Sequence, residues 1–211
     1  MKKTADLIGG AIIIMNNTLY QFEVYLYGIR PLIWRRIAIT SDASFWELGS
    51  AILDAMGWEV IHLFAFKIEK DGSDSCQNIT LSSFALDDYL PAQQVKLSDY
   101  FKREKDVCLF VYDFGDNWTH VVRLEAIEEA DPNMMYPKCL DGERACPPED
   151  CGGINGYYHM LETFNNPEDE EHEELCEWLG EDYEPEMFMP DACCFSDPKS
   201  RFERLQKGLM W

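Results

Sequence analysis

The stretch YDFGDNWTHVVRLE, residues 112–125, has the pattern of a β-hairpin. A strongly apolar run over 106–112 leads into it, and Trp118 begins a run in which alternate residues are apolar. Alternation with a period of two is typical of a strand with one buried face. The residues between the two runs, DFGDN at 113–117, favour a tight turn. The sequence therefore predicts two antiparallel strands joined by a turn that carries two carboxylates.

Upstream of this hairpin, the periodicity predicts two strands, a helix and a further strand. Their expected ranges are 19–28, 32–40, 45–56 and 61–69. Asp42 or Ser44 is expected to cap the helix at its N-terminus, and Gly57 is expected to end it. Residues 70–94 are polar and irregular, so we expect a long surface loop there.

Downstream, the residues over 132–156 are rich in Pro, Gly and Cys and show little periodicity. Helical spacing returns over 157–164 and over the acidic stretch 168–179, and Asp197 with Pro198 is expected to begin a terminal helix. This order predicts an α+β fold, with antiparallel sheet built from hairpins, helices packed on one face and a helical C-terminal part. The expected divisions are an N-terminal extension at 1–17, one domain at 18–190 and a C-terminal helix at 191–211.

The charge of the chain is concentrated in one segment. The 211 residues carry 39 acidic and 18 basic side chains, a net charge of −21. Residues 125–191 hold 21 Asp and Glu but only Lys138 and Arg144 as basic residues. This balance excludes a generic duplex nucleic-acid binder, which needs a basic face. The acidic segment is either a solvated surface that maintains solubility or a docking surface for a basic protein partner or cations.

The chain has eight cysteines, a density below that of a disulfide scaffold. No apolar run approaches the roughly 20 residues that a membrane span needs. The apolar run near the N-terminus lacks the features of a cleaved secretory leader. We therefore expect a cytoplasmic protein with no membrane association, whose thiols are mostly reduced.

Cys139, Cys146, Cys151 and His159 form the first candidate site, because three thiols and an imidazole are a possible zinc ligand set. Their spacing is not that of a C-x2-C knuckle. The alternatives are thiols that pack within a loop fixed by its glycines and prolines, or a redox pair.

A second candidate site lies on the central hairpin. Asp113 and Asp116 in the turn and His120 on the outgoing strand could form a metal site or an acid–base pair, and His62 could converge with His120. The alternative is a turn whose carboxylates accept hydrogen bonds from backbone amides, with the His120 imidazole hydrogen-bonded inside a sheet.

The pair Arg35 and Arg36 forms the third candidate. Alternation places the two guanidinium groups on opposite faces of one strand, so only one can face a site, where it could clamp a carboxylate or other anion. The alternative is ordinary surface charge. No P-loop, G-x-G-x-x-G, G-x-S-x-G or H-E-x-x-H motif is present.

Several stretches resemble the plasmid pRiA4b ORF-3-like family. They are YQFEVYLYGIRPLIWRR at 20–36, AMGWEVIHLFAF at 55–66, YDFGDNWTHVVRLE at 112–125, KCLDGERACPPEDCGGINGYYHML at 138–161 and EEHEELCEWLGEDYEPEMF at 170–188. The resemblance covers roughly 18–190. It implies a small α+β domain that is sometimes carried beside transposable elements, and it implies no established activity.

The resemblance also marks hallmark positions. They are Arg35, His62, Asp113, Gly115, Asp116, Trp118, His120, Cys139, Cys146, Pro147, Glu149, Asp150, Gly152, Gly153 and Tyr157. Relatives often carry a second histidine two residues after the position of His62, where this chain has Phe64, which argues against a paired-histidine site on that strand. The position of Cys151 is not always cysteine in relatives, which argues against a three-thiol zinc site.

Together these features predict a binding or interaction module without catalysis of its own, an accessory protein of mobile DNA that uses the acidic surface and the Cys-rich loop. The first alternative is a metal-dependent hydrolase or nuclease-like enzyme with a divalent ion near Asp113, Asp116, His120 and His62, assisted by Glu149 or Asp150. The second alternative is a structural zinc-binding domain. The expected binding-site residues are Arg35, His62, Asp113, Asp116, Trp118, His120, Glu149 and Asp150.

Overall fold

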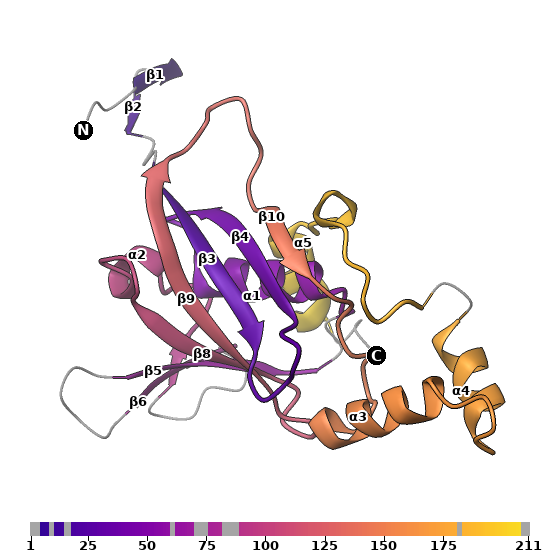
Figure 1. Cartoon of the computed structure of the whole chain (residues 1–211). Coiled ribbons are helices and arrows are strands. Elements are labelled where there is room, and N and C mark those ends of the chain that lie inside the picture. The colour runs from indigo at the N-terminus through magenta and orange to yellow at the C-terminus, as the bar shows by residue number, and fades with distance from the viewer. Residues whose placement is uncertain are drawn as a thin grey trace.

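The computed structural model describes residues 5–8, 11–14, 18–59, 62–69, 76–81, 89–180 and 183–207. It confirms the α+β fold, with a mixed sheet of eight strands and a helical C-terminal part (Figure 1). The strands are β1 (Ala5–Ile8), β2 (Ala11–Ile14), β3 (Thr18–Leu26), β4 (Trp34–Thr40), β5 (Phe64–Glu69), β6 (Cys76–Thr80), β7 (Tyr89–Pro91), β8 (Val107–Tyr112), β9 (Trp118–Glu129) and β10 (Lys138–Glu143). The helices are α1 (Phe45–Met56), α2 (Leu97–Tyr100), α3 (Gly153–Phe164), α4 (His172–Leu179), the 3-10 helix η2 (Pro190–Ala192) and α5 (Pro198–Gln206).

The large sheet has the strand order β10-β4-β3-β9-β8-β5-β6-β7, and β1 pairs with β2 in a separate hairpin. Neighbouring strands are antiparallel except β6 and β7, which are parallel. The predicted hairpins β3–β4 and β8–β9 are both present, and they lie side by side through the pairing of β3 with β9. The strongly patterned stretch identified in the sequence therefore forms the centre of the sheet.

Two regions that were expected to be irregular contain strands. The stretch 70–94 contributes β6 and β7, and the Pro-, Gly- and Cys-rich stretch 132–156 contributes β10. β10 is the edge strand at one end of the sheet, and β6 and β7 are the last two strands at the other end. The register of β10 is irregular between Cys139 and Asp141. These strands form by pairing with a neighbouring strand and carry no local pattern of their own, which is why the periodicity did not predict them.

One face of the sheet is covered by helix α1 and the other carries charged side chains. Buried apolar residues of the central strands, among them Phe22 and Phe110, form one core with the buried face of α1, which includes Phe45. On the opposite face, Arg36 pairs with Glu125 on the next strand but one at 2.6 Å. Alternation thus directs Arg36 to the open face and its neighbour Arg35 toward the core, where Arg35 is only 1 % exposed.

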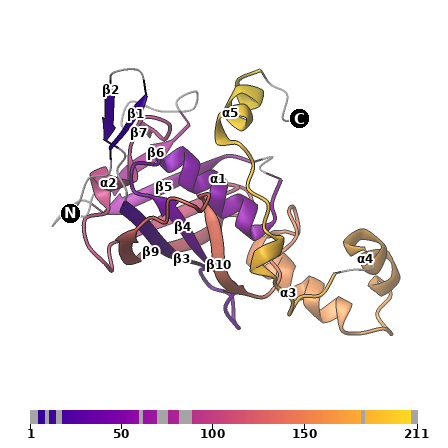
Figure 2. The same ribbon diagram turned by 90° about the horizontal axis from the view of Figure 1, so that it is seen from above.

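The C-terminal segment returns to helix α1. Figure 2 shows α5 beside α1, whereas α3 and α4 project away from the sheet. Arg201 on α5 forms an ion pair with Asp54 on α1 at 2.5 Å, and the indole of Trp46 donates to the carbonyl of Pro198 at 2.8 Å. These contacts hold the preceding coil against the end of α1 and beside β10. As predicted, Asp197 caps α5.

Helix α1 begins with a capping box that settles which residue is its N-cap. The hydroxyl of Ser44 accepts a hydrogen bond from the amide of Glu47, and the Glu47 carboxylate accepts one from the amide of Ser44 at 2.6 Å. Asp42, the other predicted cap, is exposed on the preceding turn. The box satisfies amides at the start of the helix that would otherwise have no partner.

We expect Ser44→Ala to lower the free energy of unfolding by about 1 kcal/mol, because it removes the N-cap acceptor. Asp42→Ala is the matched control and should change this free energy by less than about 0.5 kcal/mol. Urea unfolding of the two variants beside the wild-type chain measures both values. Equal losses in the two variants would contradict the assignment of the cap.

Candidate functional site

The turn between β8 and β9 is closed by backbone hydrogen bonds, and the side chain of Asp113, its first carboxylate, is held in place. Asp113 and Asn117, at its two ends, both have positive φ angles, of 52° and 57°. The amide of Asn117 donates to the carbonyl of Asp113, and the amide of Gly115 donates to Oδ1 of Asp113 at 2.8 Å. Asp113 is buried. The turn therefore fixes this carboxylate at the end of the sheet.

The Cys-rich loop folds against this turn and against the end of α1. The amide of Gly152 donates to Oδ2 of Asp116 at 3.1 Å, and the indole of Trp58 donates to the carbonyl of Pro147 at 2.8 Å. A Cβ atom on Gly153 would lie 2.7 Å from the backbone oxygen of Asp116. Only a glycine fits at this contact. The hairpin turn and the loop are separate in the sequence, and they meet in the folded chain.

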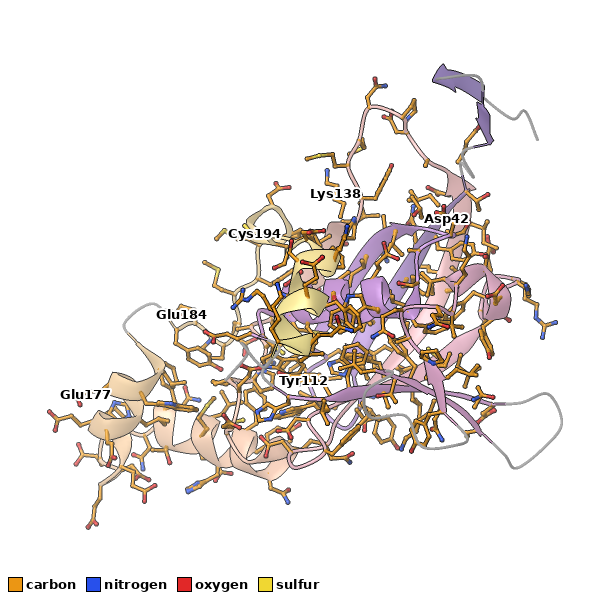
Figure 3. The ribbon with its side chains drawn as sticks, turned by 180° about the vertical axis from the view of Figure 1, so that it is seen from behind. Asp42, Tyr112, Lys138, Glu177, Glu184 and Cys194 are labelled. Atoms are coloured by element: carbon orange, nitrogen blue, oxygen red, sulfur yellow. The ribbon has the colours of Figure 1, made fainter. Side chains whose placement is uncertain are left out.

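Tyr112 and Glu149 form a further link between the sheet and the loop. The hydroxyl of Tyr112 donates a short hydrogen bond to one oxygen of Glu149, and the amide of Glu59 donates to the other at 3.3 Å. The ring of Tyr112 stacks on Trp58, with the centroids 5.1 Å apart. Figure 3 shows Tyr112 where the sheet meets the loop. Glu149 therefore supports the loop through both of its oxygens.

His62 lies between two carboxylates that come from different segments. Its Nε2 is 3.0 Å from Oδ1 of Asp150 in the Cys-rich loop, and its Nδ1 is 3.7 Å from Oδ1 of Asp113 in the hairpin turn. Asp113 is buried, His62 is half-buried and Asp150 is exposed. The imidazole is thus held on its buried side, while its other side faces an acidic group that reaches solvent.

These three residues can supply ligands to one metal ion. One imidazole nitrogen of His62 and one oxygen each of Asp113 and Asp150 lie within 4.8 Å of one another. Among the described residues, no other group of three or more His, Cys, Asp or Glu side chains meets this condition. One nitrogen and two oxygens are a donor set for a divalent ion, and three protein ligands leave coordination positions open for water or substrate.

Three of the other residues expected at the site have supporting or core positions. Asp116 holds the amide of Gly152, and Trp118 is buried in the core. His120 is also in the core, where its Nδ1 lies 3.2 Å from the carbonyl oxygen of Phe110 and its ring contacts Trp58 edge-on. His120 and His62 therefore do not converge, and we leave His120 out of the candidate site.

The expected zinc set does not come together in the described part of the chain. Cys139 is buried on β10, whereas His159 is on the exposed side of α3, 4.0 Å from Glu171. Cys146 and Cys151 are half-buried in the loop. The ligand atoms of these four residues do not meet the distance condition for a shared ion. The thiols and the imidazole therefore do not form one site.

Arg35 lies at the inner wall of a cleft of about 820 Å³ between the Cys-rich loop, the end of α1 and the C-terminal coil. Its guanidinium donates to the carbonyls of Ala55, Trp34 and Glu143 at 2.8–3.0 Å, and the ring of Phe188 covers it at 3.5 Å. The outer walls of the cleft include Trp58, Glu59, Glu149, Trp178, Met187 and Cys193.

Two groups of functional residues were missed by the sequence reasoning. Tyr112 ends a strand directly before the turn, and that position next to Asp113 was a signal that could have identified it. Met187, Phe188 and Cys193 come from the C-terminal coil and carry no local pattern that predicts a cleft. They reach the cleft because α5 is attached to α1.

The burial of His120 has a measurable consequence for stability. Loss of solvation lowers the pKa of His120 from 6.5 to about 4, so the imidazole is neutral in the folded protein at neutral pH. The unfolded chain binds a proton near pH 6.5, and the folded chain does not until about pH 4. Below pH 6.5 the unfolded state therefore gains protons first, and the folded state loses stability as the pH falls.

We expect the difference in unfolding free energy between the wild type and His120→Asn to fall by up to about 3 kcal/mol from pH 7.5 to pH 4. The comparison with the variant cancels the titration of the many carboxylates. Urea unfolding at a series of pH values measures this difference. A difference that is independent of pH would show that His120 titrates normally in the folded state.

With the fold and the site described, the chain can be compared with known proteins. It is 28 % identical over 177 residues to an uncharacterized protein, y4hQ, of Sinorhizobium fredii, an alignment that covers 79 % of this chain and 83 % of the relative. A crystal structure of a protein of unknown function from Methanosarcina mazei Go1 is 38 % identical, with a TM-score of 0.78. That match covers 84 % of this chain and 98 % of the other. The model of the plasmid pRiA4b ORF-3-like protein family matches residues 18–192. The chain therefore belongs to the plasmid pRiA4b ORF-3-like family.

Proposed function

We propose that this chain is a divalent-metal-binding module in which His62, Asp113 and Asp150 are the protein ligands. The observation that carries the proposal is the meeting of three ligand atoms from three separate segments within 4.8 Å. The imidazole suits zinc and other late transition metals, and carboxylates suit manganese as well, so we expect Zn²⁺ or Mn²⁺. Asp150 is exposed, and the binding of a shared ion would replace its contact with Nε2 of His62.

The surroundings of this cluster favour a built site over a chance contact between charges. Asp113 is oriented by the amide of Gly115, and the loop that carries Asp150 is attached to the sheet through Glu149 and Gly152. Ligands that are oriented by neighbouring hydrogen bonds bind a metal more tightly than free side chains do. The site is therefore supported by its neighbours on two sides.

A metal-dependent hydrolase is a second candidate function for the same residues. Three protein ligands leave room for a metal-bound water, and a metal ion lowers the pKa of such a water. The observation that favours it is the cleft lined by Glu59 and Glu149, because Glu149 directly precedes Asp150 of the cluster. A substrate would have to extend past Glu149 to reach the ion, because His62, Asp113 and Asp150 do not line the cleft themselves.

The acidic segment supports a further proposal, that the module docks on a basic protein partner. Helix α4 has no buried residue and projects away from the sheet, and Figure 3 shows Glu177 at the outer end of the molecule. We propose that this interaction takes place in the cytoplasm and that this chain is an accessory protein of mobile DNA. Within the described part of the chain, no helix is long and apolar enough to cross a membrane.

We expect chelator-treated protein to bind about one Zn²⁺ or Mn²⁺ per chain, measured by isothermal titration calorimetry. His62→Ala and Asp150→Asn should each weaken binding by about tenfold or more. His159→Ala is the matched control, because His159 is an exposed histidine outside the cluster. Unchanged affinity in His62→Ala, or equal effects in His62→Ala and His159→Ala, would overturn the metal site.

The docking proposal is tested with a lysine-rich peptide as the probe. Binding should be measurable at roughly 0.05 M salt and lost at about 0.5 M salt, because salt screens exposed charges. Replacement of Glu173, Glu174 and Glu177 by Gln should weaken it. A control variant with the same charge change at Glu23, Glu125 and Glu128, on the open face of the sheet, should not. Equal losses in both variants would show that net charge alone attracts the peptide.

A further inference from the structure

The outer walls of the cleft beside Arg35 expose large apolar side chains. Trp178, Met187 and Met189 all line this cleft, and each of these side chains is more than half exposed. They come from two segments, since Trp178 is near the end of α4 and the two methionines belong to the coil that follows it. Globular proteins seldom gather large exposed apolar side chains at one place unless a partner covers them.

The inner side of the cleft is also largely apolar. Trp58 and Pro147 are buried there, and the half-buried ring of Phe188 covers the guanidinium of Arg35. The volume of about 820 Å³ gives room for an apolar side chain that enters from outside. Methionine side chains adapt to apolar groups of different shapes, and tryptophan is frequent among the residues that contribute most of the binding energy at protein interfaces.

The charge that the cleft presents to a ligand is negative. Asp54, Glu59 and Glu149 line it, and Arg35 is the only basic side chain among the described residues that do so. Arg35 is buried, and its guanidinium is hydrogen-bonded to three carbonyls, so its charge is not open to a ligand. Asp54 is paired within the chain, whereas Glu59 is exposed. The cleft therefore favours a positively charged ligand.

Helix α4 joins this cleft to the acidic surface of the docking proposal. Glu177 directly precedes Trp178, and α4 has no buried residue. A partner attracted by the carboxylates of α4 would have its own apolar side chains within reach of Trp178. A small molecule inside the cleft would leave most of the exposed apolar side chains in water. A polypeptide segment that lies across the opening covers them and reaches α4 at the same time.

We propose that the cleft takes one large apolar side chain from a basic segment of a protein partner, with flanking Lys or Arg side chains paired to Glu59 and Glu177. The proposal rests on the docking function proposed above, and it names the residue types by which the partner is recognised. The carboxylates attract the segment to the surface. The apolar side chains of the cleft then distinguish basic segments that carry an apolar anchor from those that do not.

Two peptides of equal charge separate the cleft from a general attraction between charges. One is a fluorescein-labelled, lysine-rich peptide with a central Phe, and the other has Ser in place of that Phe. Fluorescence anisotropy at about 0.05 M salt should show that the Phe peptide binds about tenfold more tightly, because burial of the ring adds a contribution that charge does not supply. Equal affinities would overturn the cleft proposal and leave the docking proposal standing. Absence of binding by both peptides would overturn both proposals.

Paired surface variants test where the anchor side chain binds. Met189→Ser and Trp178→Ser should each lower the affinity for the Phe peptide by about fivefold and leave the affinity for the Ser peptide unchanged. Met135→Ser and Phe114→Ser are the matched controls, because these side chains are also more than half exposed and do not line the cleft. None of the four changes removes a buried side chain. Equal effects of Met189→Ser and Met135→Ser on the Phe peptide would refute the assignment.

Other occupants of the cleft predict different results. If a second copy of the chain covered it, sedimentation velocity would show a dimer that Met189→Ser dissociates. If the ligand were a small apolar molecule, N-acetylphenylalanine amide would displace the Phe peptide at a concentration close to the dissociation constant of that peptide. Either result would overturn the proposal. We expect a sedimentation coefficient that Met189→Ser does not change, and displacement only at concentrations about a hundredfold higher or more.

Discussion

A coil with little helix or strand must satisfy its backbone polar groups through contacts with other parts of the chain, and this constraint organises the molecule. The loop after β10 does so by attachment to the end of the sheet. Trp58 donates to Pro147, and Asp116 accepts from Gly152. Because these contacts bring the loop to the β8–β9 turn, they also bring Asp150 to His62. The candidate metal site is thus a product of how the loop is anchored.

The same anchoring creates the cleft. One wall is the loop, and the opposite wall is the C-terminal coil, which Asp54 holds through Ser196 and Arg201. Arg35 lies between them with carbonyl oxygens and a phenyl ring as its neighbours. A cation in this position has lost most of its hydration, which lowers the pKa of Arg35. The carbonyl hydrogen bonds offset part of that loss and fix the guanidinium at the wall of the cleft.

Local patterns predicted the parts of the fold that local interactions stabilise. The two hairpins and α1 follow from alternation, turn formers and a capping box, and all are present. Strands β6, β7 and β10 depend on pairing with partners distant in sequence, which no local pattern records. The same distinction applies to the histidines. Alternation placed His120 on one face with Trp118, Val122 and Leu124, and that apolar face forms the core. His62 meets its partners only in the folded chain.

The candidate metal site and the cleft share one structural element, the Cys-rich loop, and this limits how independently they can behave. Cys146 lies beside Arg35 at one end of the loop, and Asp150 lies beside His62 at the other. Glu149 stands between them, held by Tyr112 and by the amide of Glu59. An ion bound at Asp150 would reduce the freedom of the most exposed part of this loop, and with it the freedom of one wall of the cleft. A ligand that enters the cleft would act on the same segment from the other side. Any energetic coupling between ion binding and ligand binding in the cleft would have to be reciprocal, by thermodynamic linkage.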